Sequence, residues 1–318
     1  ARGNGKADAI LDQAALMARP DRIKVAVAQY PIGEPATVAE WREKAARWVA
    51  EGAETGAQLL VFPEYGAMEI AATFGAEIAG DLQRSLAAVA SLADDMDAFY
   101  AELAARHGVH VLTPSGPVRR TDGAFVNASR LVTPTGRMGV QEKLIMTPFE
   151  RDWGIAPGHG LRVFKTALGR IGIAICYDSE FPLLVRAQAE AGADLMLIPS
   201  CTEFLSGYYR VRAAACARAL ENQIATAVAP TVGDAPWSPA VDKNAGVGGI
   251  YVPPEASLSM TGVLAEGRLN EPGWVSAEID FVAIENVRTG GEMRNAADWS
   301  LQPGAKPLAG EVELVSLS

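Results

Sequence analysis

Short β-rich runs alternate along this chain with longer segments of helical periodicity. The first run covers residues 23–29 and is almost entirely apolar, as expected of a buried strand. The segment that follows, residues 38–51, places Trp41, Ala45 and Trp48 on one helical face. This alternation predicts an α/β fold in which helices cover the faces of a sheet.

The alternation continues without a break, so the chain is predicted to form one domain. No Pro- or Ser-rich linker and no block of like charge divides it. We place the domain at residues 23–290, between an N-terminal extension at 1–22 and a C-terminal tail at 291–318. The remaining elements are expected as strands at 58–62, 109–112, 171–175, 195–199 and 224–229, helices at 82–106, from 180 onward and at 210–221, and a hairpin over 124–142 that turns at 133–136.

The charge balance excludes some classes of partner. The 318 residues include 38 acidic and 28 basic side chains, which give a net charge of −10. A nucleic acid or an anionic membrane would need clustered Lys and Arg, so neither partner is expected. No apolar run reaches the roughly 18 to 20 residues that cross a bilayer. The three cysteines are too few for a disulfide framework, which favours a reducing, cytoplasmic location.

The common cofactor motifs are absent from the sequence. Residues 246–249 lack the spacing of a dinucleotide-binding loop, and no phosphate-binding P-loop occurs. His107 and His110 are expected on the surface or at a helix end, and His159 in a turn. Because no Cys-x-x-Cys or His-Glu-x-x-His spacing accompanies these histidines, we expect neither a metal nor an organic cofactor.

Three side chains stand at the ends of predicted elements, where α/β folds place reactive groups. Glu64 follows the strand at 58–62, Lys143 ends the hairpin, and Cys176 stands between a strand and a helix start. Taken singly, each has an ordinary structural explanation: a solvated loop carboxylate, a surface lysine and a buried inert cysteine. Position alone therefore does not decide between a catalytic and a structural role.

Five short motifs in a fixed order give these residues a common context. They are F-P-E at 62–64, E-K-L at 142–144, I-C-Y-D-S-E-F-P at 175–182, G-A-D-L-M-L-I-P-S at 192–200 and R-A-x-E-N at 218–222. From about residue 23 to 281, the chain thereby resembles the carbon-nitrogen hydrolase (nitrilase/amidase) superfamily. The resemblance implies a four-layer α-β-β-α sandwich. It also implies a catalytic triad, with Glu64 as general base, Lys143 as electrostatic stabiliser and Cys176 as nucleophile.

Further residues are carried over with the motifs. Glu150 is expected to orient Lys143 or to contact the substrate, although a loop ion pair would explain it as well. The backbone N–H of Tyr177 is expected to help bind the oxyanion, and Cys201 to line the pocket. Glu180 stands where similar ω-amidases often carry an arginine that binds a carboxylate. Neutral or cationic amides are therefore expected to be preferred, unless Glu180 only begins a helix.

The resemblance predicts a thiol hydrolase that cleaves a small non-peptide amide to a carboxylic acid and ammonia through a cysteine thioester. Nitrile hydrolysis is the alternative, favoured by the loop around Glu150 but not by the pair Tyr177-Asp178 after the nucleophile. A silent binding protein on the same fold is disfavoured because all three triad positions are filled. Superfamily members generally pair across the face that carries the nucleophile's helix and the following one, so we expect a homodimer or a larger homo-oligomer. The apolar contacts are expected from Phe181, Leu183, Leu184, Tyr208 and Tyr209.

Overall fold

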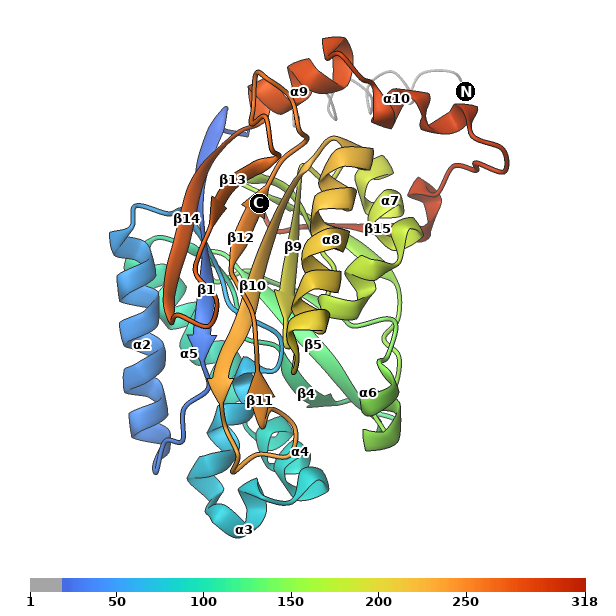
Figure 1. The fold of residues 1–318 in the computed structure, drawn as a ribbon. Coiled ribbons are helices and arrows are strands. Elements are labelled where there is room, and N and C mark those ends of the chain that lie inside the picture. Colours follow the sequence, from blue (N-terminus) through green and yellow to red (C-terminus); the bar gives the residue numbers. More distant parts are fainter. Residues whose placement is uncertain (1–18) are drawn as a thin grey trace, which may run out of the picture.

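Two β-sheets pack face to face, and helices cover the outer face of each sheet (Figure 1). The computed structural model describes residues 19–318. The first sheet contains β14 (Gly273–Asp280), β1 (Arg22–Pro31), β2 (Leu59–Val61), β3 (His110–Leu112), β5 (Phe125–Val132), β4 (Gly116–Arg119) and β6 (Met138–Glu142). The second contains β15 (Val312–Ser316), β7 (Leu161–Thr166), β8 (Gly169–Ile173), β9 (Leu195–Ser200), β10 (Ala225–Asp234), β12 (Gly249–Tyr251) and β13 (Val263–Glu266).

The sheets are joined at one place, where the ends of β1 and β10 pair in parallel through Tyr30 with Thr231 and Pro31 with Val232. Outside this junction the two sheets are separate layers, each with its own helices. The order helix, sheet, sheet, helix confirms the predicted four-layer α-β-β-α sandwich.

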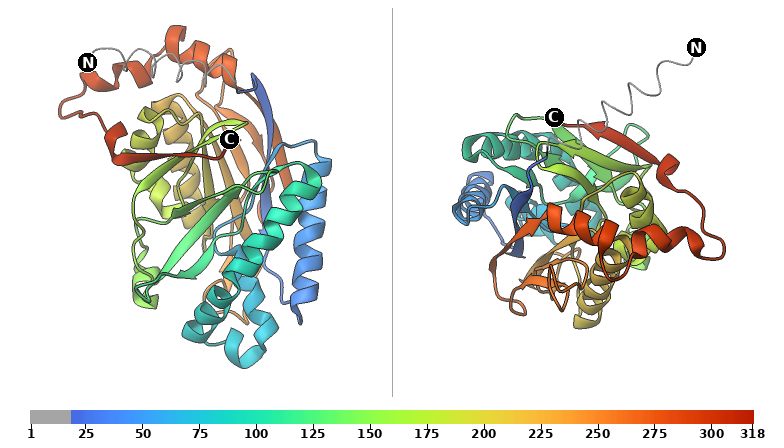
Figure 2. Two further views of the ribbon diagram at one scale, coloured as in Figure 1. Left: turned by 180° about the vertical axis from the view of Figure 1, so that it is seen from behind. Right: turned by 90° about the horizontal axis from the view of Figure 1, so that it is seen from above.

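Helices α2 (Val38–Glu54) and α5 (Ala93–His107) lie on the first sheet, and α7 (Pro182–Glu190) and α8 (Leu205–Asn222) lie on the second, as the two views in Figure 2 show. Helix α2 buries the predicted apolar face, which includes Trp41, Ala45 and Trp48. The other elements are η1 (Gly66–Phe74), α3 (Ala76–Ala79), α4 (Leu82–Ser91), α6 (Pro148–Trp153), η2 (Cys176–Glu180), β11 (Lys243–Asn244), α9 (Phe281–Gly290), α10 (Asn295–Asp298), η3 (Trp299–Leu301) and η4 (Ala309–Glu311).

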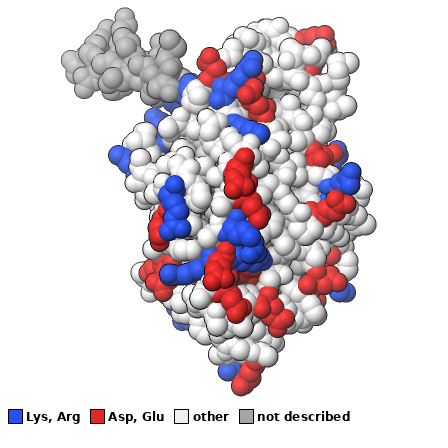
Figure 3. Space-filling model, turned by 90° about the vertical axis from the view of Figure 1, so that its left-hand side faces the viewer, with Lys and Arg blue, Asp and Glu red and all other residues white. Residues whose placement is uncertain are grey.

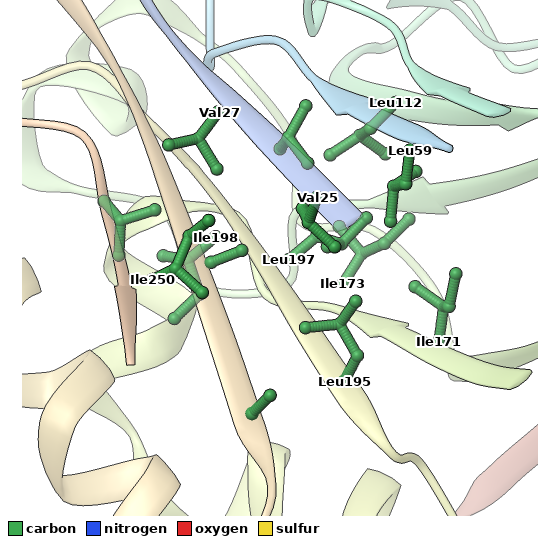
Figure 4. Packing of buried hydrophobic residues seen from close by; sticks show 14 of the residues in the cluster. Val25, Val27, Leu59, Leu112, Ile171, Ile173, Leu195, Leu197, Ile198 and Ile250 are labelled. Carbon is green, nitrogen blue, oxygen red and sulfur yellow. The ribbon is translucent and has the colours of Figure 1, made fainter. Parts of the chain in front are cut away.

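The main hydrophobic core lies between the sheets (Figure 4). Strand β1 directs Val25 and Val27 into this core, whereas the intervening Ala26 contributes to the layer under the helices. This alternation is the period-two pattern of a strand buried on both faces. The core residues labelled in Figure 4 are Val25, Val27, Leu59, Leu112, Ile171, Ile173, Leu195, Leu197, Ile198 and Ile250.

Two local predictions were wrong. The single helix expected at 82–106 is two helices, α4 and α5, because Leu92 leaves the helical conformation; Asp94 and Asp95 then stand in the first turn of α5, where carboxylates stabilise a helix start. His110 is not on the surface but buried in β3, between β2 and β5. Burial lowers the pKa of His110.

The C-terminal segment, residues 291–318, contributes to the second sheet. Strand β15 pairs in parallel with β7 and is the edge strand there. The segment before it packs on α7, where the Arg186 guanidinium lies 4.5 Å from the ring centre of Trp299 and the Leu308 N–H donates to Glu190. The domain boundaries remain predictions, and residues 1–18 of the expected extension lie outside the described residues.

The face that carries α2 shows Lys and Arg side chains interspersed with Asp and Glu (Figure 3). On α2 itself, for example, Arg47 lies 3.9 Å from Glu51. Within residues 19–318, no helix is long and apolar enough to cross a membrane. In the same part of the chain, no three His, Cys, Asp or Glu side chains form a group that could hold a metal ion.

Candidate active site

Glu64 follows the end of β2, and its side chain lies in the interior of the protein. The chain stays extended beyond the strand, since Phe62 N–H donates to Leu112 and Ser115 N–H donates to Pro63. It then turns sharply at Tyr65, which has a left-handed backbone with φ +52°. The Glu64 side chain is 1% exposed, so it is not the solvated loop carboxylate that its position also allowed.

Lys143 follows β6 directly, and its N–H donates to the carbonyl of Asn127 on the neighbouring β5. The ammonium group lies between two carboxylates, 2.7 Å from Glu64 Oε1 and 2.6 Å from Glu150 Oε2. Its side chain is 1% exposed, which rules out the surface-lysine alternative. A buried ammonium is stable only when such partners offset its lost hydration.

Glu150 is held in place by the short helix α6. Thr147 and Glu150 form a reciprocal capping box, in which each side chain accepts a hydrogen bond from the other's backbone N–H. The second oxygen of Glu150 accepts from the hydroxyl of Tyr65 at 2.9 Å. Glu150 therefore caps helix α6 and also binds the Lys143 ammonium group. It is not the loop ion-pair partner that the sequence also allowed.

Cys176 stands beyond β8 at the first position of the turn η2. Its backbone is left-handed, with φ +48°, which is strained for a residue with a side chain. The turn is held in place after Cys176: Ser179 Oγ donates to the Cys176 carbonyl at 2.6 Å, and Arg218 on α8 donates to the Ser179 carbonyl. The strain is therefore maintained by specific contacts.

Asp178 connects this turn to the lysine loop. Its buried carboxylate accepts hydrogen bonds from the backbone N–H groups of Leu144 and Ile145, the two residues after Lys143, at distances of 2.8–3.2 Å. Burial raises the pKa of Asp178 to about 7. The sequence around Asp178 predicts no contact for its side chain, because the neighbouring residues do not indicate which backbone N–H groups it will bind.

The protonation states are set by burial and by mutual charge. Burial alone would lower the pKa of Lys143, but Glu64 and Glu150 outweigh it and raise the pKa. Burial raises the pKa of Glu64, whereas Lys143 and its hydrogen bonds hold the pKa of Glu150 below the usual value despite burial. Burial, followed by the charge of Glu64, raises the pKa of the Cys176 thiol. The resting thiol is therefore neutral.

The thiol lies close to Glu64, with which it forms a side-chain hydrogen bond. Cys176 Sγ is 3.9 Å from the carbonyl of Cys201, and the Cys201 N–H donates to Glu64 Oε2 at 3.0 Å. The peptide of Cys201, just beyond β9, thus contacts both groups. Cys201 is partly exposed as a residue, but burial of its thiol raises the pKa of that group to about 12.

These groups line a cavity of about 480 Å³. We call its buried charged part the floor, defined by Glu64, Lys143, Glu150 and Cys176. We call its more exposed charged part the mouth, defined by Glu180 and Arg210. The cavity lining also includes Tyr177 and Cys201. The remaining lining residues were not singled out from the sequence: Tyr65, Thr147, Phe149, Trp153, Thr202, Glu203, Phe204, Ser206, Gly207, Val211, Pro239, Ala240, Asp242 and Lys243.

Glu180 lines the cavity at the end of η2, but it is not an isolated negative charge. Arg210, on the second turn of α8, lies with Nε 3.4 Å from Glu180 Oε1. Arg210 is 60% exposed, while Glu180 is 20% exposed. The repulsion of anionic substrates that was expected from Glu180 alone is therefore offset by a cation that the local motif does not contain.

Comparisons with known proteins identify the family of the chain. The family model for carbon-nitrogen hydrolases matches residues 24–288, and the chain belongs to this family. It is 31% identical over 277 residues to the probable hydrolase YhcX of Bacillus subtilis, which covers 87% of this chain. The chain spans only 53% of that relative's length.

Other relatives divide between two activities. The omega-amidase NIT2-B of Xenopus laevis is 26% identical over 77% of this chain and 84% of its own length. The bifunctional nitrilase/nitrile hydratase NIT4A of Lupinus angustifolius is 30% identical over 52% of this chain and 49% of its own. Among solved structures, Saccharomyces cerevisiae Nit3 superposes with a TM-score of 0.68 at 21% identity, covering 84% of this chain and 93% of that one. This structural likeness supports the fold.

Proposed function

We propose that the protein hydrolyses a small non-peptide amide to a carboxylic acid and ammonia, with Cys176 as nucleophile, Glu64 as general base and Lys143 as electrostatic stabiliser. The strongest support is the floor of the cavity. There a neutral thiol adjoins a buried carboxylate whose pKa is raised, and a lysine held by two carboxylates stands beside both. These are the parts that acyl transfer through a thiol requires.

The reaction begins when Glu64 takes the thiol proton and the Cys176 sulfur attacks the amide carbon. Two N–H groups of Lys143 donate to carboxylates among residues 19–318, and its third is free to donate to the oxygen that becomes negative. The backbone N–H of Tyr177 is the proposed second donor. The carbon–nitrogen bond then breaks as Glu64 returns the proton to the nitrogen, which leaves as ammonia.

The thioester is hydrolysed in the second half of the reaction. Glu64 takes a proton from water, the hydroxide attacks the thioester carbon, and Lys143 again stabilises the negative oxygen. The carbon–sulfur bond breaks, the acid leaves, and the thiol regains its proton from Glu64. One difficult amide hydrolysis is thereby divided into two easier transfers.

Ammonia release across a panel of small amides, measured with the chain as it exists, tests this proposal. We expect turnover of at least one amide and its complete loss after one equivalent of iodoacetamide has alkylated Cys176. If no amide is hydrolysed, or if full alkylation leaves the rate unchanged, the proposal is wrong.

Nitrile hydrolysis is the second candidate, because the capping-box loop that holds Glu150 resembles the nitrilase form of that segment. The same ammonia assay with nitriles distinguishes the two. An amidase should release ammonia from the amide of a matched amide and nitrile pair far faster than from the nitrile, and a nitrilase should show the reverse.

The proposed assembly is a homodimer formed across α7 and the start of α8. Leu183 and Tyr209 are each about 60% exposed there, whereas Tyr208 is buried and does not contribute. Light scattering at micromolar concentration should give about twice the 33.5 kDa chain mass. A monomeric mass would contradict this assembly.

A further inference from the structure

Asn127, on β5, contacts both carboxylates at the floor of the cavity and the backbone of Lys143. Its carbonyl accepts the Lys143 N–H at 2.8 Å, and its amide nitrogen lies 3.0 Å from Glu64 Oε1 and 3.4 Å from Glu150 Oε1. The residue is fully buried. Neither the sequence motifs nor the proposed mechanism uses it.

The orientation of the Asn127 amide is determined by its neighbours. Tyr65 N–H donates to Ser115 Oγ at 3.1 Å, so the Ser115 hydroxyl hydrogen is directed elsewhere. It points to Asn127 Oδ1, 2.7 Å away. Because Oδ1 accepts this hydrogen bond, the NH2 group of Asn127 must face the two carboxylates.

The two oxygens of Glu64 are consequently not equivalent. Oε1 accepts from Lys143 and Asn127, which uses both of its lone pairs. Oε2 accepts the Cys201 N–H, from the peptide whose carbonyl contacts the Cys176 thiol, and the Cys176 side chain is itself hydrogen-bonded to Glu64. Because both lone pairs of Oε1 are used, Oε2 is the oxygen that has a lone pair left for the thiol proton.

We propose that Asn127, oriented by Ser115, is a positioning residue that keeps Glu64 ionised before the reaction and leaves Oε2 as the oxygen that takes the Cys176 proton. The proton moves from sulfur to Oε2 and later from Oε2 to the departing nitrogen, so no additional acid or base is needed. This inference rests on the proposed function, because it concerns the base of that reaction.

The pH dependence of the site follows from this assignment. A hydrogen bond from a neutral donor stabilises a carboxylate over its protonated form, so its loss should raise the pKa at which Glu64 becomes a base. The other titratable groups around Glu64 stay unchanged in the variants proposed below. They are Lys143 after β6, Glu150 on α6, Cys176 and Asp178 on η2, Cys201 after β9 and Tyr65 before η1.

The test uses Asn127→Leu, which has a similar size and keeps the backbone carbonyl that supports Lys143. The rate of Cys176 alkylation by iodoacetamide is measured from pH 5 to 9, and ammonia release is measured over the same range. We expect the acidic limb of both profiles to move up by about one pH unit, as for loss of one charge-assisted hydrogen bond. Turnover at neutral pH should fall roughly tenfold and recover in part at higher pH.

Two further variants complete the experiment. Ser115→Ala leaves Asn127 in place but removes the hydroxyl that orients its amide group. We therefore expect the acidic limb of both profiles to move in the same direction by a smaller amount. Ser85→Ala is the control, because that buried hydroxyl donates only to Leu82 in its own helix, α4, and should move neither profile. In Cys176→Ala, any alkylation that remains measures the reaction of iodoacetamide with the other cysteines.

An unshifted acidic limb in Asn127→Leu, or a loss of activity that is equal at every pH, would overturn the proposal. If Asn127→Leu does not fold, Ser115→Ala decides the question, and an unshifted limb there has the same meaning. Alkylation needs no substrate. A protein that hydrolyses no amide would thus refute the proposed function, while the alkylation profile would still test the role of Asn127.

Discussion

The floor and the mouth of the cavity both contain paired charges, but the two pairs have different environments. At the floor, Lys143 and its two carboxylates are at most 2% exposed and bonded at 2.6–2.7 Å. At the mouth, Arg210 is 60% exposed and makes one 3.4 Å contact with Glu180. Water screens the mouth but not the floor, so removing a partner should be severe at the floor and mild at the mouth.

The largest effect is expected at Cys176, the proposed nucleophile. Cys176→Ala should lower kcat by at least about 10³-fold, because the other thiol that lines the cavity, Cys201, has its pKa raised to about 12 and donates to Glu64 through its backbone N–H. The melting temperature should stay close to that of the unmodified protein, since alanine occupies the same backbone and removes only one buried atom. Retention of more than a small fraction of the ammonia-release rate would show that Cys176 is not the nucleophile.

Glu150→Gln tests the charge compensation at the floor. Lys143 would keep its geometry but lose one of its two negative partners, and a broken buried pair costs about 3 kcal/mol or more. We expect a lower free energy of unfolding in urea by roughly that amount and a loss of about 10²-fold in kcat. If stability is unchanged, the buried charges are not coupled as the geometry indicates.

Asp178→Asn tests the hydrogen bonds that connect the turn η2, which contains Cys176, to the two residues after Lys143. The amide cannot accept from both Leu144 and Ile145 without turning its NH2 group toward one of them, so kcat should fall by about tenfold with little change in KM. A change confined to KM would contradict a positioning role.

The same variant has a pH signature. The pKa of Asp178 is about 7 in the folded state, above the ordinary value in the unfolded chain, so its ionisation opposes folding. As pH rises from about 4 to about 7, the unmodified protein should lose stability relative to Asp178→Asn, with no further change above that range. Urea unfolding at several pH values measures this difference, and a constant difference would contradict the assigned pKa.

The smallest effects are expected at the mouth. Arg210→Ala should expose the charge of Glu180 and increase the preference for a neutral over an anionic amide, measured as kcat/KM, by roughly threefold to tenfold. Glu180→Arg should weaken or reverse that preference. Arg47→Ala is a matched control, since Arg47 is 61% exposed and paired with one glutamate on α2, away from the cavity. Equal changes in Arg47→Ala and Arg210→Ala would refute a role for the mouth.

The features that the sequence predicted correctly depend mostly on residues that are close together in the chain. Period-two and helical patterns predicted the strands and covering helices, and motif order predicted which three side chains to examine together. The break at Leu92 was missed because the apolar periodicity of α4 and α5 runs across it. Asn127 was missed for a different reason. Glu64 lies 63 residues away in the sequence, and the sequence around a polar residue in a hairpin strand does not indicate which distant side chain it will contact.

By itself, the sequence determined the family, the alternation of elements and the positions of Glu64, Lys143 and Cys176 at element ends, because these depend on residues close together in the chain. Only the tertiary structure decided how the charges are compensated. Glu180 meets Arg210 from 30 residues away, and Lys143 meets Glu64 from 79 residues away. Electrostatic energies depend on distance and burial, and neither is defined until the two sheets have packed together.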